Sequence, residues 1–347
     1  MWPSVAVIVP VRNEERYLRV GVEAILAQQY PGSIEVCLAV APSTDATSTI
    51  AAELAATHPS ISVVANPGGL TPSGLNAAIK ATSGEIVVRV DGHAALSPGY
   101  IGRAVETLQR TGAVNVGGVQ RAVGDTPFED AVAAAMSSPF GAGDARFHTG
   151  GAEAAVDTVY LGVFRRDALE AVGLYDERLV RNQDYELNIR LRGAGGVVWF
   201  DPELWVTYRP RGSLRLLARQ FFEYGQWKQS VVRMHPRSTK LRQVIAPIAT
   251  AGIILGSIGG LRWRPGFAIP GVYALAVGLA SVRTARGVNA RAFRLLAIFP
   301  TMHLSWGAGF LLGLLPTPRT HRQPASRSRT SALMESVSSR TRRGSRR

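Results

Sequence analysis

Residues 85–93 read Glu-Ile-Val-Val-Arg-Val-Asp-Gly-His, and this stretch decides how the whole chain is interpreted. The apolar run 86–90 predicts a buried strand that ends at Asp91. Asp91 and His93 are two residues apart, so we expect their side chains on the same side of the extended chain. Open α/β sheets bind ligands at this end of their strands, where a carboxylate and an imidazole can hold a divalent cation. The alternative is a helix cap at Asp91 and an ordinary polar loop residue at His93.

The first 120 residues alternate between short β-branched runs and stretches with helical spacing. Predicted strands cover 5–9, 34–40, 61–65 and 86–90, and predicted helices cover 14–28, a segment capped at 43–45 that ends near 57, and 71–81. Such alternation forms βαβ units. We therefore expect an α/β, Rossmann-like domain with a mostly parallel sheet. The glycine-rich segment 114–210 adds predicted strands at 156–163 and 197–200 and predicted helices at 166–172 and 184–192.

The C-terminal third is strongly apolar. Runs 244–261 and 265–282 each contain 18 uncharged residues, and run 295–315 contains 21, interrupted by Pro300 and His303. Because a helix needs about 20 apolar residues to cross a bilayer, residues 238–316 are predicted to form two to three transmembrane helices. The alternative is a buried helical subdomain. The basic, aromatic-rich segment 211–234 predicts an amphipathic helix, either at the membrane interface or packed as an ordinary surface helix.

The sequence leaves the membrane topology open. Residues 317–347 hold nine Arg and one Glu, a charge of +8 out of +14 for the whole chain. We expect a disordered tail beside the membrane rather than a nucleic-acid-binding segment, because no nucleic-acid-binding motif accompanies it. With a cytoplasmic first domain, three crossings would place this tail outside, against the positive-inside tendency. Either the third segment does not cross, or the tail is exported. Cys37, the only cysteine, is expected to be a core residue.

Polar residues also follow the first three predicted strands. The first strand runs into Pro10, Arg12 and Glu14, which is typical of nucleotide binding but also of plain helix capping. Asn76 and Lys80 are four residues apart on one helix face, where they either reach a phosphate or sugar or belong to a solvated surface. Neither a P-loop nor a Gly-x-Gly-x-x-Gly after the first strand is present, which argues against a dinucleotide dehydrogenase.

Asp184 stands at a predicted junction between a loop and a helix. It is either an N-cap or a general base that takes a proton from an attacking hydroxyl. A carboxylate is ionised at neutral pH unless it is buried, so this base would need no large pKa shift.

Together these segments resemble family 2 glycosyltransferases with the GT-A fold, over roughly residues 3–235. The matching pieces, in order, are VIVPVRNEE at 7–15, STDAT at 43–47, GLNAAI at 74–79, GEIVVRVDGH at 84–93, GLYDE at 173–177 and QDYEL at 183–187. The later RQFFEYGQWK at 219–228 and the apolar C-terminal segments are similar to succinoglycan-type glucosyltransferases, which build exopolysaccharide.

The resemblance implies an inverting transfer from a nucleotide-diphosphate sugar, with a UDP-sugar as the first choice. It places Pro10, Arg12 and Glu14 at the nucleotide and Asp45 near the base or ribose. Asp91 and His93 take the outer places of the family's Asp-x-Asp and would bind Mg²⁺ or Mn²⁺ and the diphosphate. Asp184 takes the base position. The implied clamp near the diphosphate or acceptor is Arg219, Gln220 and Trp227.

Three residues depart from the family pattern. Ala41 stands where many members carry an Asp, which leaves the nucleotide open. His93 replaces a carboxylate and favours Mn²⁺. Gln183 replaces the usual Glu before the base.

We therefore expect a membrane-associated glycosyltransferase that acts on a lipid-linked or polysaccharide acceptor in cell-envelope or exopolysaccharide synthesis. Its catalytic domain, 1–237, would be cytoplasmic, followed by the membrane region 238–316 and the tail 317–347. The rival hypothesis is a non-catalytic nucleotide-sugar-binding partner of a membrane glycan assembly.

Overall fold

The computed structural model of the chain describes residues 1–287 and 292–315. The predicted basic tail lies outside the described residues.

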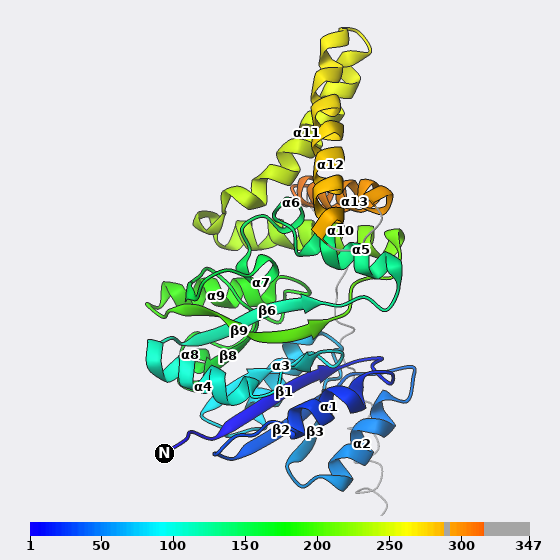
Figure 1. Cartoon of the computed structure of the whole chain (residues 1–347). Coiled ribbons are helices and arrows are strands. Elements are labelled where there is room, and N and C mark those ends of the chain that lie inside the picture. The colour runs from blue at the N-terminus through cyan, green and yellow to red at the C-terminus, as the bar shows by residue number, and fades with distance from the viewer. Residues whose placement is uncertain (288–291, 316–347) are drawn as a thin grey trace, which may run out of the picture. The chain divides into compact units, whose positions relative to one another are not determined.

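The N-terminal half of the sheet follows the βαβ pattern predicted from the sequence. Its elements are β1 (Val5–Val11), α1 (Leu18–Leu26), β2 (Ile34–Val40), α2 (Thr47–Thr57), β3 (Ile61–Ala65), α3 (Thr71–Lys80) and β4 (Ile86–Arg89). The strands are all parallel, in the order β3-β2-β1-β4 (Figure 1). Their carboxyl ends, and the loops that follow them, therefore meet at one edge.

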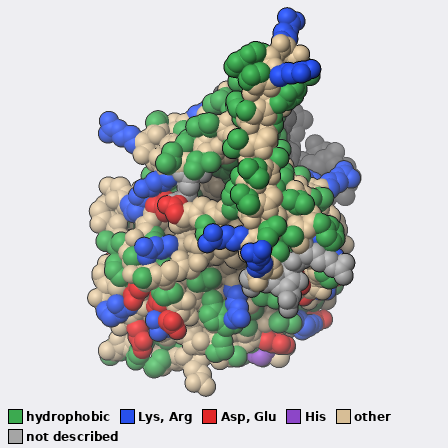
Figure 2. Space-filling view, turned by 45° about the horizontal axis from the view of Figure 1, so that its top comes forward, with side chains coloured by type: hydrophobic (Ala, Val, Ile, Leu, Met, Phe, Trp, Pro, Cys, Tyr) green, Lys and Arg blue, Asp and Glu red, His purple; other side chains and the backbone are tan. Residues whose placement is uncertain are grey.

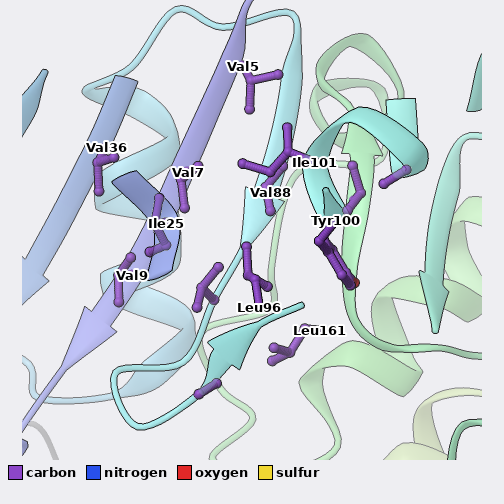
Figure 3. Close-up of a cluster of buried hydrophobic side chains, with 14 of the residues drawn as sticks. Val5, Val7, Val9, Ile25, Val36, Val88, Leu96, Tyr100, Ile101 and Leu161 are labelled. Atoms are coloured by element: carbon purple, nitrogen blue, oxygen red, sulfur yellow. The ribbon is translucent and has the colours of Figure 1, made fainter. Parts of the chain in front are cut away.

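Alternating side chains of these strands build two cores. Val7 of β1, Val36 of β2 and Val88 of β4 lie in one cluster with Ile25 of α1 and Tyr100 of the later helix α4 (Tyr100–Thr111) (Figure 3). Their neighbours in sequence point to the opposite face and pack beneath α3, and Cys37 is one of them, buried as expected. The sheet is thus covered on both faces, which requires the near-continuous apolar runs seen in its strands.

The second half of the sheet is mixed. Its elements are β5 (Ala95–Leu96), α4 (Tyr100–Thr111), β6 (Asn115–Ala122), α5 (Pro127–Met136), α6 (Pro139–Ala142), α7 (Arg146–Thr149), β7 (Ala154–Ala155), β8 (Tyr160–Arg165), α8 (Arg166–Ala171), α9 (Gln183–Gly193) and β9 (Val198–Tyr208). Strand β8 lies antiparallel between β4 and β6, so the sheet is parallel only in part. The predicted strand at 156–163 begins later, at Tyr160, and the one at 197–200 continues to Tyr208.

Strands β6 and β9 approach each other very closely at one point. A Cβ atom at Gly118 would lie 1.9 Å from the carbonyl oxygen of Leu204, and the pairing register shifts between Gly117 and Val119. Only glycine fits there, so this residue permits the bulge that lets the long β9 continue past Pro202.

Four long helices follow the sheet, namely α10 (Leu214–Met234), α11 (Leu241–Gly260), α12 (Ala268–Gly287) and α13 (Ala292–Leu312). Three of them, spanning 243–260, 264–286 and 292–312, are long and apolar enough to cross a membrane. Figure 1 shows α11 and α12 rising together as a hairpin, while α13 lies across their base beside α10. Helix α10, which ends before residue 237, packs against the later helix α13, so the domain boundary predicted at residue 237 stays a prediction.

Candidate active site

Asp91 follows β4 at the carboxyl edge of the sheet and lines a cavity of about 690 Å³. Its Oδ1 atom accepts hydrogen bonds from Nε and Nη2 of Arg89, at 3.1 and 3.0 Å. The two residues are two apart on an extended segment, so their side chains lie on the same side. One carboxylate oxygen of Asp91 is thus held by a cation, and the other remains for a ligand.

Arg89 also bonds to Asp184, the second residue of α9, through its Nη1 atom. The Arg89 side chain is only 4% exposed, whereas Asp91 and Asp184 keep 22% and 28% of their side chains exposed. The guanidinium therefore lies behind the two carboxylates and joins the predicted metal residue to the predicted base. The ring of Tyr175 packs 5.9 Å from the guanidinium carbon.

Arg89 is a site residue that the sequence reasoning did not single out. The available signal was an arginine inside an otherwise apolar strand, because a charge is buried there only when it is paired. Its partner Asp184 is 95 positions away in sequence, and no local spacing rule connects them.

Burial raises the pKa of Asp184; the positive charge of Arg89 opposes this shift, and the nearby Asp91 adds to it. The net direction is upward. The expectation of an ionised base held only for a carboxylate that is not buried; burial does act on Asp184, and Arg89 limits its effect by favouring the ionised form.

His93 lies in the loop after Asp91, and its Nδ1 atom is 2.9 Å from Oε1 of Glu14. Burial lowers the pKa of His93, but the Glu14 hydrogen bond and the negative charges of Asp91 and Glu14 outweigh it, so the pKa is raised. Glu14 thus holds the imidazole at the edge of the cavity and joins the β1 loop to the Asp91 loop.

The described residues contain no cluster of three or more His, Cys, Asp or Glu side chains able to hold a metal ion by themselves. Asp91 and His93 do face the same cavity. Magnesium-type ions are commonly held by one or two protein groups, with water and substrate phosphates completing the shell. The pair therefore fits a cation that is shared with a diphosphate.

The loops after β1 and β2 are tied together by short polar contacts. Asn13, at a positive φ of 55°, accepts a hydrogen bond from the Thr44 N–H at 2.9 Å. Asp45 accepts from the N–H of Glu15 at 3.2 Å and from the hydroxyl of Thr47 at 2.6 Å. The Thr47 hydrogen bond lowers the pKa of Asp45. The Asp45 carboxylate thus fixes the shape of both loops, and its predicted place near the base or ribose stays a prediction.

Arg12 and Pro10 lie beside these loops. The Arg12 side chain is exposed and reaches the carbonyl of Gly69, in the loop after β3, at 3.5 Å. Arg12 thus links the loop after β1 to the loop after β3, and its predicted role at the nucleotide stays a prediction.

Asn76 and Lys80, which were predicted to contact the ligand, do not line the cavity that contains Asp91. Asn76 is buried, and its amide bonds to both backbone groups of Tyr175, at 3.0 and 2.9 Å, and to Glu177 at 2.9 Å. Lys80 is the last residue of α3, near the start of β4 and hence at the opposite edge of the sheet from Asp91. Asn76 thus packs on the loop around Tyr175, and the Lys80 side chain is exposed to solvent.

Of the three predicted clamp residues, Gln220 alone lines the described cavity wall. Its Nε2 donates to the hydroxyls of Tyr208 and Tyr224, at 2.9 and 3.0 Å, and its buried Oε1 has no partner among the described residues. The Arg219 side chain is 78% exposed and pairs with Glu223 at 3.0 Å. Trp227 packs against the cluster around Leu179. Arg219 and Trp227 do not line the described cavity, so the geometry gives no support to the clamp role predicted for them.

The far wall of the cavity is formed by the apolar helices. Ile245 and Ala249 of α11, Met302 and Trp306 of α13, and Phe140 of α6 line it. Arg181 and Arg211 line the same cavity, and Arg181 pairs with Glu223 at 3.2 Å. The cavity thus runs from two carboxylates past cationic groups to a hydrophobic wall.

Comparison with known proteins adds to this geometry. The sequence model of "Glycosyl transferase family 2" matches residues 6–173. The "Succinoglycan biosynthesis protein ExoA" of Rhizobium meliloti (strain 1021) is 31% identical over 316 residues, 90% of this chain and 95% of that protein.

Two more distant proteins are also similar. A "Dolichyl N-acetyl-alpha-D-glucosaminyl phosphate 3-beta-D-2,3-diacetamido-2,3-dideoxy-beta-D-glucuronosyltransferase" of Methanococcus voltae is 24% identical over 238 residues, 66% of this chain and 74% of that protein. The solved structure of the mannosyltransferase PcManGT from Pyrobaculum calidifontis, in complex with GDP-Man and Mn²⁺, aligns with a TM-score of 0.60. It is 22% identical, and the alignment covers 92% of this chain and 89% of that one.

Proposed function

The chain belongs to glycosyl transferase family 2 and is a glycosyltransferase with the GT-A fold, and we propose that it moves a sugar from a nucleotide-diphosphate sugar to a lipid-linked saccharide. The product would be part of an exopolysaccharide or another cell-envelope glycan. One observation carries this proposal: a single cavity contains Asp91, Asp184 and the apolar walls of α11 and α13. The rival hypothesis of a non-catalytic partner is set aside, because the chain is an enzyme of this family.

The donor would enter from the carboxyl edge of the parallel strands. The exposed Arg12, with the tied loops of Asn13 and Asp45, forms the nucleotide side. A UDP-sugar is our first choice of donor. The solved PcManGT structure is described in complex with GDP-Man, so a donor screen must include GDP-sugars as well as UDP-sugars.

Asp91 and His93 would hold Mg²⁺ or Mn²⁺ at the diphosphate. The bound cation would neutralise charge that gathers on the leaving diphosphate. The Mn²⁺ in the PcManGT complex supports a divalent ion, and the imidazole of His93 favours Mn²⁺ over Mg²⁺.

Asp184 would act as the general base. It would take the proton from the acceptor hydroxyl as that oxygen attacks the anomeric carbon from the side opposite the diphosphate, which inverts the configuration. Arg89 holds one oxygen of Asp184 and leaves the other to face the cavity. The carboxylate is thereby kept ionised and oriented.

The hydrophobic end of the cavity would receive the lipid carrier of the acceptor. The wall formed by Ile245, Met302 and Trp306 suits a lipid chain, and Arg211, which lines the same cavity, suits a lipid phosphate. The name of the relative from Methanococcus voltae includes a dolichyl-linked sugar phosphate, which supports an acceptor of this class.

The test is sugar transfer by the full chain in nanodiscs, with labelled nucleotide sugars, Mn²⁺ or Mg²⁺, and a membrane lipid extract as the acceptor source. We expect a labelled glycolipid with one donor, and a loss of about 10²-fold or more in Asp184→Asn and Asp91→Ala. Asp167→Asn, an exposed acid on α8, is the matched control and should retain activity. Full turnover in both site variants would refute the assigned mechanism.

A further inference from the structure

We propose that only α11 and α12 cross the bilayer, and that α13 stays on the catalytic side, lying along α10. The membrane part would then be a two-helix hairpin, although three helices are apolar enough to span. The proposal concerns topology alone and is independent of the donor and acceptor.

The first observation is that α10 and α13 run parallel with their backbones in contact. A Cβ atom at Gly225 would lie 2.0 Å from the carbonyl oxygen of Trp306, and one at Gly309 would lie 2.1 Å from that of Phe222. Farther along both helices, Gly313 meets Gln229. Glycines that allow such an approach along the helices bind them into one unit. The two helices must therefore share one orientation relative to the bilayer.

The second observation is the charge of α10. This helix carries Arg215, Arg219, Glu223, Lys228 and Arg233 within 21 residues. Each Lys or Arg at the centre of a bilayer costs about 2.5–3.5 kcal/mol. Helix α10 therefore cannot cross, and α13, held along it, does not cross either.

The third observation is that both ends of α13 are bonded to the catalytic part. Near its start, Arg294 donates to the carbonyl of Pro127, the first residue of α5, at 2.7 Å. Just beyond its end, the carbonyl of Leu314 accepts from Arg233 of α10 at 2.7 Å. A helix that crossed the bilayer would have its ends on opposite sides.

The hairpin of α11 and α12, unlike the pair of α10 and α13, has the length and the exposed apolar surface of a membrane-spanning segment. Each helix has 20 residues, or about 30 Å, which is the thickness of the hydrocarbon core. The side chains of Ile254, Leu255 and Leu275 are more than half exposed. Figure 2 shows hydrophobic side chains over these helices and Lys or Arg side chains at their tip.

Charged and aromatic residues mark both ends of the hairpin. Arg262, Trp263 and Arg264 are exposed in the turn between the helices, and Arg283 and Arg286 are exposed near the end of α12. Arginine and tryptophan at these places suit the two membrane–water interfaces. Two arginines in the centre of the bilayer would be costly, so the turn is expected to reach the far surface.

This arrangement answers the question that the sequence left open. After two crossings, Leu315 lies on the same side as the catalytic domain. The basic sequence that follows it would begin on that side, in agreement with the positive-inside tendency.

The test uses single cysteines in a Cys37→Ala background of the full chain, in sealed membrane vesicles of known orientation. Ser60→Cys reports the catalytic domain, Trp263→Cys the turn of the hairpin, and Leu315→Cys the end of α13; all three positions are exposed. Each variant is labelled with a membrane-impermeant maleimide before and after detergent, and complete labelling in detergent shows that each thiol is reactive.

We expect Ser60→Cys and Leu315→Cys to be labelled from the same side and Trp263→Cys from the other. Labelling of Leu315→Cys together with Trp263→Cys would show that α13 crosses and would overturn the proposal. Labelling of all three from one side would show that the hairpin does not cross, and would overturn it equally.

Discussion

Replacing Arg89 by methionine removes the buried cation that lies between Asp91 and Asp184. Methionine keeps much of the side-chain volume, so the main change is electrostatic. Removing one partner of a buried ion pair costs about 3–5 kcal/mol, because the remaining charges are left without compensation. Here two carboxylates lose the same partner. We expect the upper part of that range at neutral pH, or a lowering of the thermal midpoint on the order of 10 °C.

The loss should depend on pH. Without Arg89, burial and the nearby Asp91 charge raise the folded-state pKa of Asp184 further above its unfolded value, because the opposing positive charge is gone. An acid whose pKa is raised on folding destabilises the protein as pH rises from the unfolded value through the folded one. The difference between Arg89→Met and the wild type should therefore shrink as the pH falls towards 4, near the reference pKa of aspartate.

The assay is thermal unfolding of purified protein in one detergent at several pH values, together with transfer kinetics well below the midpoint. Arg103→Met is the matched control. The Nε atom of Arg103 donates to the buried carboxylate of Asp201 at 2.9 Å, and neither residue lines the cavity. The control should lose stability but keep its kcat. Arg89→Met should also lose kcat, by about 10²-fold or more, since the base is no longer held ionised. The double variant Arg89→Met/Asp184→Asn lacks one of the two uncompensated charges, so it should regain part of the stability that Arg89→Met loses.

Wild-type stability and kcat in Arg89→Met would refute the reasoning. A double variant whose loss of stability equals the sum of the losses in the two single variants would refute it as well.

Three further outcomes follow from the structure. The transfer rate should rise with pH as Asp184 loses its proton, and because the pKa of Asp184 is raised, this rise should lie above the ordinary pH range of aspartate titration. A rise at or below that range would contradict Asp184 as the base. Chelation of divalent ions should abolish transfer, and His93→Ala should raise the Mn²⁺ concentration needed for half-maximal rate by about tenfold or more; an unchanged metal titration would remove His93 from the site. Gly309→Leu should lower the free energy of unfolding by about 1–3 kcal/mol, measured by thermal unfolding, because the new side chain forces α13 away from α10. The control Gly278→Leu on α12 has open space around it and should not lower the stability. Equal effects of the two substitutions would argue against the close packing of α10 and α13.

Much of the catalytic half was predictable from sequence, because its signals are local. Apolar runs and helical spacing indicated β1 to β4 and their parallel order, and the polar ends of these strands indicated one edge for ligands. Asp91 and His93 were found in this way, and Asp184 from its place at the start of a predicted helix and from the family resemblance; all three line one cavity. The apolar composition of the last third likewise indicated its helices.

Other features could be decided only by the tertiary structure, since they join segments far apart in the chain. The antiparallel insertion of β8, the burial of Asn76 against Tyr175 and the link from Arg89 to Asp184 have no local spacing to reveal them. The same holds for α13, whose composition matches a membrane span although the folded chain packs it closely against the charged helix α10. Periodicity reports which face of an element is apolar, but the partner of that face is chosen by the folded chain as a whole.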